Sequence, residues 1–404
     1  MEYRIKYGNQ HIDLRVPENI EPITVNPPQS IPDKKVFLEE LSALIKPGLV
    51  SAGIVVSDKT RICGYDKYLP WLIEALKSKG LDKYSIKFYI AYGTHPRQTD
   101  LESLRMYGNI YNNYEFIHHE CDDNDIMINI GTTNRGTEVE IRRDILEHDL
   151  LILFGSVLHH YFAGYGGGRK LLFPGLAARR AIYSNHKLFI DFDNMTLQPG
   201  CRSGKLKDNP VAEDLYEIDR LMPHKILISG IPDAGGKIRK LMIGSSYEDF
   251  LSACKIYDNH YRKEGNIRFD NVIAGSGGYP KDINFIQTHK SLHNAASFVR
   301  DGGNLFLLGE CIDGVGNKEF LNIFKGSIKD IYFNLGKQYS GNGGTALSLL
   351  SKTERIKVYM TTNLDTRVCN TLNIKKLTPE EMNYKTSRLK GDSAIIENAS
   401  IVYS

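Results

Sequence analysis

The segment from His159 to Lys170 carries the residues best suited to chemistry, because it joins histidines, a run of glycines and a lysine behind an apolar stretch that predicts a strand. Glycine lets a backbone turn tightly and approach a ligand closely, and successive amides in such a loop can bind an anion. A P-loop requires Ser or Thr after its lysine, where Leu171 stands, and a dinucleotide fingerprint requires a small residue at the position of Arg169. The loop by itself therefore predicts either a ligand-binding loop or a structural turn.

Three histidines in predicted loops favour a ligand-binding site over a structural turn. His95 follows an earlier predicted strand, His160 lies shortly before Lys170, and His186 lies after it. Histidine titrates near neutrality and also ligates metals. The set therefore suits two acid/base imidazoles and one metal ligand beside a lysine.

Other histidines are expected to have no part in this site. His118 and His119 are adjacent, and neighbouring residues of a strand point to opposite faces, so they are not expected to share one metal ion. We expect this pair to lie in a solvated loop. We also expect His159 to point away from the side to which His160 points.

Short apolar runs that end in Gly, Asp, Asn or Ser alternate with helical patterns along the chain. Such runs predict buried parallel strands of a doubly wound α/β architecture, with ligands bound in the loops after the strands. They lie at residues 53–57, 86–91, 150–154, 225–228, 272–274, 305–308 and 356–360. A capping box, Thr99 with Glu102, predicts the start of a helix that ends before Gly108.

The predicted fold is thus α/β, with two α/β domains, mainly parallel sheets and an active site in the cleft between the domains. We place the domain boundary in the polar stretch 259–266. An N-terminal cofactor-binding domain is expected over residues 1–264 and a C-terminal α/β domain over 265–389. For the segment from about 390 to 404, a return to the N-terminal domain is an open alternative.

Composition excludes several classes of protein. The 404 residues include 51 basic and 48 acidic side chains, a balance too even for a nucleic-acid-binding face. The six cysteines have no C-x-x-C spacing, which argues against zinc ribbons, iron–sulfur clusters and a disulfide framework. No apolar run reaches the roughly 18 residues of a membrane span, and the opening lacks the apolar region of a signal peptide. We therefore expect a cytoplasmic enzyme without nucleic-acid or membrane partners.

The stretch from His160 through Gly167-Gly168-Arg169-Lys170 and Pro174-Gly175 to His186 resembles the core motif of the nickel-dependent lactate racemase family. Members of this family are nickel-pincer nucleotide racemases and epimerases of 2-hydroxy acids. The resemblance implies that nickel pyridinium-3,5-bisthiocarboxylic acid mononucleotide is bound covalently to Lys170. It also implies that His186 ligates the nickel, that His95 and His160 are the acid/base pair, and that the remaining cofactor contacts come from three residues, Gly167, Gly168 and Asp58.

Two further segments carry the resemblance, which spans residues 57 to 290. Residues 57–61 (SDKTR) resemble an early family motif, with Ile62 where proline is usual, and residues 277–284 (GGYPKDIN) lead to Gln287 and Lys290. By this resemblance Arg61, Gln287 and Lys290 bind the substrate, with the two cationic groups holding its carboxylate. Separate maturation proteins are implied as partners, because they make the cofactor.

The reaction implied is inversion at C2 of a 2-hydroxy acid. One histidine removes the hydroxyl proton while hydride moves from Cα to the cofactor; the resulting 2-keto acid is then reduced on its other face. Ile286 stands where lactate-specific members have tyrosine, and residues 339–344 (YSGNGG) stand where they have tryptophan. We therefore expect a substrate larger than lactate. Lactate racemase proper, a nicotinamide-dependent 2-hydroxy acid dehydrogenase and a nickel or nucleotide carrier remain the alternatives.

Overall fold

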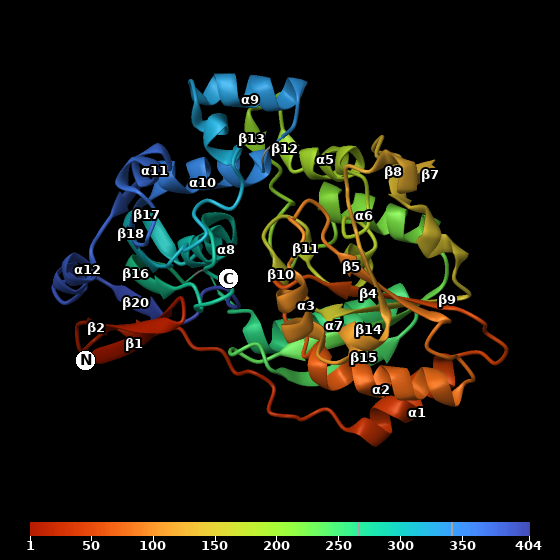
Figure 1. The fold of residues 1–404 in the computed structure, drawn as a ribbon. Coiled ribbons are helices and arrows are strands. Elements are labelled where there is room, and N and C mark those ends of the chain that lie inside the picture. The colour runs from red at the N-terminus through yellow and green to blue at the C-terminus, as the bar shows by residue number, and fades with distance from the viewer. Residues whose placement is uncertain (266, 341) are drawn as a thin grey trace. The chain divides into compact units, whose positions relative to one another are not determined.

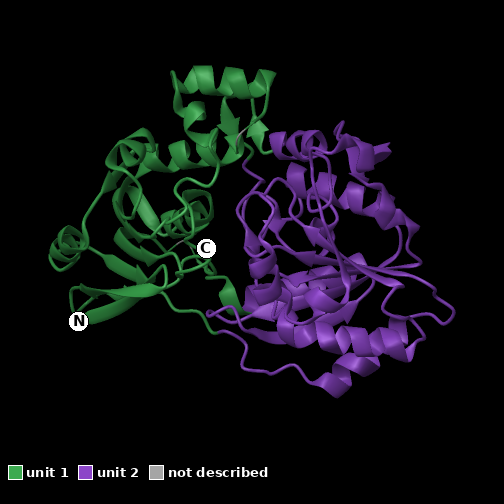
Figure 2. Cartoon of the chain, in the orientation of Figure 1, with its two compact units in different colours: residues 1–26, 189–198, 260–404 green, residues 27–188, 199–259 purple. Residues whose placement is uncertain are grey.

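The computed structural model describes residues 1–265, 267–340 and 342–404 of an α/β protein with two mainly parallel sheets. The chain divides into two compact units, which Figure 2 distinguishes by colour. Unit 1 comprises residues 1–26, 189–198 and 260–404, and unit 2 comprises residues 27–188 and 199–259. The predicted fold class is confirmed.

Unit 2 is built on a sheet in the order β15-β14-β9-β4-β5-β6, in which only β15 is antiparallel to its neighbour. Its central strands are buried along their whole length, as expected of parallel strands covered on both faces. The strands are β4 (Ala52–Ser57), β5 (Ile86–Ala91), β6 (Glu115–His118), β9 (Leu150–Ser156), β14 (Lys225–Pro232) and β15 (Ile238–Gly244). The four apolar runs predicted as strands in this part of the chain are all confirmed.

Helices α1 and α2 of unit 2 pack against each other, and both contribute side chains to the hydrophobic core that contains the strands of the main sheet (Figure 1). The capping box predicted at Thr99 is present, and α3 ends before Gly108 as expected. The helices are α1 (Lys34–Leu44), α2 (Tyr65–Ser78), α3 (Asp100–Tyr107), α4 (Ile110–Asn113), α5 (Arg179–Lys187), α6 (Pro210–Leu221) and α7 (Tyr247–Tyr261), the last of which runs into unit 1. In the part of the chain that the structure describes, no helix is long and apolar enough to cross a membrane.

Unit 2 also contains several short elements between its main strands and helices. Two hairpins pair β7 with β8 and β10 with β11, and three 3-10 turns connect the larger elements. They are β7 (Met127–Thr132), β8 (Glu138–Arg142), β10 (His159–His160), β11 (Gly164–Tyr165), η1 (Asn124–Ile126), η2 (Arg143–Glu147) and η3 (Gly168–Leu171). The glycine-rich segment of the sequence thus forms the small β10–β11 hairpin and the turn η3.

Unit 1 has a second sheet, in the order β19-β18-β17-β16-β20-β3, whose paired strands are all parallel. Its strands are β3 (Glu21–Pro22), β16 (Phe269–Gly275), β17 (Val299–Leu308), β18 (Lys357–Thr361), β19 (Ile374–Lys376) and β20 (Ser393–Ile396). Unit 1 also contains two hairpins, β1 (Glu2–Tyr7) with β2 (Gln10–Arg15) and β12 (Ile190–Asp191) with β13 (Thr196–Leu197). Its helices are α8 (Phe285–Ala296), η4 (Phe320–Phe324), α9 (Ile328–Lys337), α10 (Gly343–Arg355), α11 (Thr366–Thr371) and α12 (Pro379–Thr386).

The two units differ from the predicted division at residue 264. The first 26 residues join unit 1, because β3 pairs with β20 and Ile5 packs in one core with Ile273. The segment 390–404 also belongs to unit 1, since β20 lies between β16 and β3. Both groupings depend on pairing between distant parts of the chain, which local composition does not encode. The polar stretch 259–266 does contain the change from unit 2 to unit 1, although Asn266 lies outside the described residues.

Candidate active site

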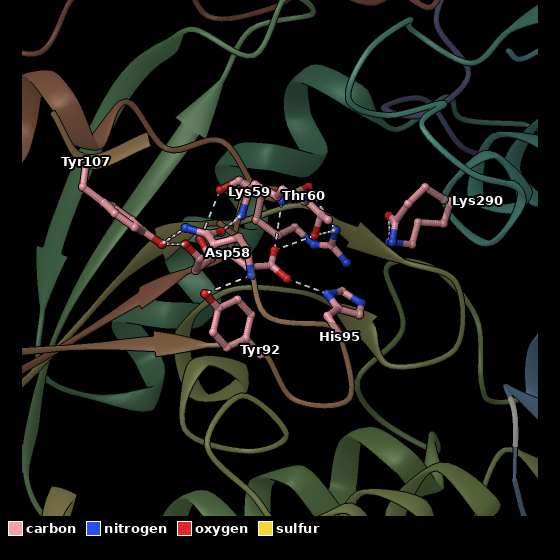
Figure 3. Close-up of polar contacts among 11 residues, drawn as sticks. Asp58, Lys59, Thr60, Tyr92, His95, Tyr107 and Lys290 are labelled. Atoms are coloured by element: carbon pink, nitrogen blue, oxygen red, sulfur yellow. Dashed lines mark hydrogen bonds and ion pairs between the residues drawn. The ribbon is translucent and has the colours of Figure 1, made fainter. Parts of the chain in front are cut away.

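The loop after β4 places a carboxylate against the imidazole of His95. The Asp58 Oδ2 atom lies 2.6 Å from His95 Nδ1, and the Asp58 side chain is almost wholly buried (Figure 3). Burial raises the pKa of Asp58, but the charge and hydrogen bond of His95, with Arg61 and Thr60, outweigh it and hold the pKa well below its usual range. The carboxylate therefore stays ionised and fixes the orientation of the His95 ring.

Thr60 completes this arrangement, although the sequence-based hypothesis gave it no role. Its backbone N–H and its hydroxyl both donate to Asp58 Oδ1, at 2.9 and 2.6 Å. The Thr60 hydroxyl oxygen accepts in turn from Arg61 Nη1 at 2.9 Å. An Asp side chain bonded to the amide two residues on is an Asx turn, so the Asp-x-Thr spacing was the available signal.

The aromatic ring of Phe162 brings three of the predicted residues together within unit 2. Its centroid lies 4.5 Å from that of His160 and 5.0 Å from that of His186, and Lys170 Nζ lies 5.6 Å from it. Phe162 stands in the motif that carries the resemblance but had no predicted role. Sequence spacing gave no sign that its ring would stand between these groups.

Electrostatic coupling connects this cluster to the loop after β4. Burial lowers the pKa of Lys170 well below its usual value, and the positive charges of Arg61 and Arg169 lower it further. Burial, with Lys170 and His95 nearby, lowers the pKa of His186 to about 3. His186 is consequently neutral at physiological pH, which is the state that ligates a metal. At a given pH, a larger fraction of Lys170 is deprotonated than of an exposed lysine.

The glycines beside Lys170 are required by packing of the chain itself. Gly167 has φ +78° and Gly168 has φ +52°, in the region that favours glycine. A Cβ at Gly167 would lie 2.6 Å from the carbonyl oxygen of Ser156, and one at Gly168 would lie 2.7 Å from the Phe250 ring. A contribution of either residue to a cofactor would therefore come from its backbone.

His159 and His160 point to different partners, as expected. His159 Nε2 lies 2.8 Å from an Asp258 carboxylate oxygen, and its side chain is buried. His160 Nδ1 accepts from the N–H of Ala163 at 3.3 Å, and its ring contacts Phe162. His160 belongs to the cluster around Phe162, and His159 is paired with Asp258.

The prediction of a solvated loop at His118 and His119 is wrong. His118 ends β6 and its Nδ1 lies 2.8 Å from the Tyr92 hydroxyl, while His119 is buried with its Nε2 3.1 Å from the Ala177 carbonyl oxygen. Burial lowers the pKa of His119 to about 4, so this ring is a neutral structural donor. Both histidines therefore have structural partners.

Two of the three predicted substrate residues, Gln287 and Lys290, lie near the start of α8 in unit 1. Asn284 caps this helix by accepting from the N–H of Gln287 at 3.0 Å, and Lys290 Nζ donates to Gln287 Oε1 at 2.6 Å, one turn apart. Ile286, on the same helix, packs against the hydrophobic core of unit 1. The structure thus pairs Gln287 with Lys290.

Comparison with known proteins identifies the family. The lactate racemase N-terminal domain matches residues 7–197, and the lactate racemase C-terminal domain matches residues 265–334. A lactate racemase from Lactiplantibacillus plantarum is 32% identical over 314 residues, which cover 77% of this chain and 70% of the relative. The chain belongs to the lactate racemase family. A lactate racemase from Thermoanaerobacterium thermosaccharolyticum is 30% identical over 275 residues, or 68% of this chain and 63% of the relative's length.

Solved structures support the fold of this family member. The lactate racemase apoprotein from Thermoanaerobacterium thermosaccharolyticum superposes with a TM-score of 0.85 at 24% identity, over 100% of both chains. A protein from Thermotoga maritima superposes with a TM-score of 0.73 at 16% identity, over 94% of this chain and 100% of the other. At these identities the likeness establishes the fold alone.

The two positions that depart from the lactate-specific pattern are described in part. Gly341 of the stretch 339–344 lies outside the described residues. Of its neighbours, the Tyr339 hydroxyl accepts from the N–H of Gly344 at 3.1 Å, and Asn342 Oδ1 accepts from Asn317 at 2.9 Å. The polar groups of this loop thus hold the start of α10.

Proposed function

We propose that this family member inverts the C2 stereocentre of a 2-hydroxy acid, using a nickel-pincer nucleotide attached to Lys170. The observation that carries the proposal is the cluster around Phe162, where His160, His186 and Lys170 meet within unit 2. His95, paired with Asp58, is close enough to this cluster to influence His186 electrostatically. The chain covers only 63% of the length of the relative from Thermoanaerobacterium thermosaccharolyticum. The proposed activity is therefore inferred from the residues of this site.

The residues present fit the cofactor that the family implies. A thioamide tether needs an amine that is readily deprotonated, and the buried Lys170 has a pKa well below the usual lysine value. A nickel ligand needs a neutral imidazole, and His186 has a pKa of about 3. Lys170 would hold the organic part and His186 the metal. When bound, such a cofactor supplies an acceptor for the hydride of the substrate Cα–H bond.

The hydrogen bonds of the two remaining histidines determine which nitrogen carries the proton in each neutral ring. The ionised Asp58 binds Nδ1–H of His95, which places the lone pair of the neutral ring on Nε2, ready to accept the substrate hydroxyl proton. His160 Nδ1 accepts from Ala163 N–H, which places the proton of its neutral ring on Nε2, where it can donate a hydrogen bond to a substrate oxygen. For His160 to give or take a proton at Nε2, its ring must pass through a form protonated at Nδ1, which gives up the hydrogen bond from Ala163. We propose that His95 and His160 exchange the roles of base and protonated acid between the two directions of inversion.

Cationic side chains favour an anionic substrate. Arg61 and Lys170 lie close enough for the charge of Arg61 to lower the pKa of Lys170. A carboxylate near Arg61 would be stabilised by that charge, and an arginine can hold it through two parallel hydrogen bonds. We propose that Gln287 and Lys290, paired on α8, complete substrate binding.

The substrate is proposed to be larger than lactate, a C4–C6 hydroxy acid or aldonate. The support is the sequence itself: Ile286 and the stretch 339–344 provide neither of the aromatic side chains that a methyl-sized pocket would use. Lactate racemase proper is the alternative. A nicotinamide-dependent dehydrogenase is disfavoured, because the loop before Lys170 lacks the dinucleotide fingerprint and the cluster contains a second histidine, His186, beside His160.

The test uses full-length protein from a host that makes the cofactor. Intact mass should show an adduct, metal analysis should show nickel, and one enantiomer of the 2-hydroxy acid should convert to the racemate without added nicotinamide cofactor. Conversion that depends on added NAD, with net formation of the keto acid, would establish the dehydrogenase instead. An adduct with nickel but no activity on any 2-hydroxy acid would support a carrier.

A further inference from the structure

A small cavity in unit 2 is lined by Arg169 of η3, the residue before the proposed tether Lys170. Its volume is about 30 Å³. It is lined by side chains of η3, α6, β14 and the start of α7: Arg169, Asp219, Lys225, Leu227, Ser245, Ser246, Tyr247 and Phe250. Lys225 begins β14 and Ser245 follows β15, so this is the edge of the sheet where the parallel strands start. Asp58 and His95 follow the ends of β4 and β5 instead, whereas η3 lies in the segment after β9.

The guanidinium of Arg169 is the unusual group in this cavity. Arg169 is 4% exposed, and its Nε, Nη1 and Nη2 atoms are buried without a hydrogen bond to any residue that the structure describes. Its neighbours are aromatic faces, with the guanidinium carbon 4.8 Å from the Phe250 ring centroid and 5.7 Å from that of Tyr247. Arginine remains charged in proteins, and a buried charge is retained only with a compensating partner. The cation–π contacts compensate part of the charge but use none of its five N–H donors.

The charged side chains that line the cavity are Arg169, Lys225 and Asp219. Lys225 Nζ lies 2.9 Å from Asp219 Oδ1, so these two charges offset each other, although this oxygen makes no hydrogen bond to the described residues. Asp249 accepts from the N–H groups of Ser245 and Ser246, at 2.9 and 3.0 Å, which caps that end of α7. Arg169 is left as the cation whose donors the described residues do not use.

We propose that this cavity binds an oxyanion, a phosphate or carboxylate group, through the guanidinium of Arg169. Planar guanidinium donors match both groups through paired hydrogen bonds. A buried water needs a cavity of roughly 10–15 Å³, so this cavity admits a few atoms and excludes a nucleoside. Ser246 is exposed at its margin, so the group can enter from solvent.

Binding here would act on the proposed tether through the chain. Arg169 and Lys170 are successive residues of η3, which packs against β9, β14 and β4. Their side chains reach different surroundings, since Arg169 lines this cavity while Lys170 contacts the Phe162 ring. An anion on Arg169 would hold the turn that positions Lys170 and would neutralise a positive charge beside it.

The test is calorimetric titration of the full-length cofactor-free protein with inorganic phosphate, and separately with acetate, at an ionic strength held constant with sodium chloride. We expect saturable binding of one of the two anions, and the better ligand identifies the group as phosphate or carboxylate. Arg169→Met should weaken it by about tenfold or more, the loss of a charge-assisted contact. Arg105→Met, which removes an exposed arginine of α3, is the matched control and should leave binding unchanged.

A second variant keeps the test decisive if Arg169→Met does not fold. Asp219→Asn removes the carboxylate that borders the cavity and pairs with Lys225, so it should tighten anion binding by about threefold or more. Asp313→Asn, an exposed position in unit 1, should have no effect. Absence of saturable binding to both anions, or binding that neither Arg169→Met nor Asp219→Asn alters, would overturn the proposal. The experiment needs no cofactor and no turnover, so its failure leaves the proposed racemase activity untouched.

Discussion

Replacement of Asp58 by asparagine tests the proposed orientation of His95 with little change in side-chain size. The two oxygens of Asp58 have different partners: Oδ1 accepts from the N–H and hydroxyl of Thr60, and Oδ2 lies 2.6 Å from His95 Nδ1. In the variant, the amide oxygen must face Thr60, because the Thr60 N–H can only donate. The amide nitrogen then faces His95 and donates to Nδ1, which moves the imidazole proton to Nε2.

The expected loss of activity follows from this change of tautomer. With its proton on Nε2, neutral His95 cannot accept the substrate hydroxyl proton. A charge-assisted hydrogen bond alone is worth roughly 1.5–3 kcal/mol, or about 10–150-fold in rate. Because the general base is lost as well, the expected decrease in rate is about 10²–10⁴-fold. We therefore expect kcat for racemisation to fall by at least about 10²-fold in both directions, while the adduct on Lys170 and the nickel content remain.

The assay is racemisation measured by chiral chromatography on cofactor-loaded protein, normalised to nickel. Asp258→Asn is the matched control, because Asp258 pairs with His159 at 2.8 Å in the same unit but has no proposed catalytic partner. That variant should retain activity within a few-fold. An Asp58→Asn enzyme with near wild-type kcat, or equal impairment of the two variants, would refute the proposed role of Asp58.

Four further outcomes are expected. Lys170→Ala should lose both the adduct mass and racemisation, whereas a retained adduct would place the tether elsewhere. His186→Ala should lose nickel while the organic adduct remains, as read from metal analysis and intact mass, and full nickel retention would assign the ligand to another residue. His186 has a pKa of about 3 in the folded protein against about 6.5 in the unfolded chain, so between these pH values the unfolded state binds one more proton. The free energy of unfolding of the cofactor-free protein should therefore fall as pH decreases from about 6.5 toward 3. His186→Gln should reduce the slope of this dependence by at most about 1.4 kcal/mol per pH unit, and an unchanged slope would contradict the assignment. In a substrate panel, a C4–C6 hydroxy acid or aldonate should have a higher kcat/KM than lactate, and a preference for lactate would contradict the proposed pocket while leaving the catalytic roles intact.

The sequence by itself determined the elements and the identity of the chemical groups. Apolar runs such as 86–91 and 150–154 are strands because a parallel strand buried on both faces must be apolar, and the capping box at Thr99 is present because its hydrogen bonds join residues three apart. The motif from His160 to His186 identified the family because its residues are close together in the chain. These are local features, and local sequence specifies them.

Tertiary structure decided which groups meet. The pairing of Asp58 with His95, the ring of Phe162 among His160, His186 and Lys170, and the membership of residues 1–26 in unit 1 all join segments far apart in sequence. Burial is likewise a property of the folded chain, and it gives His186 and Lys170 pKa values that no residue type shows by itself. The same reason explains His119, whose polar neighbours in sequence suggested solvent but whose ring is enclosed by packing against Ala177.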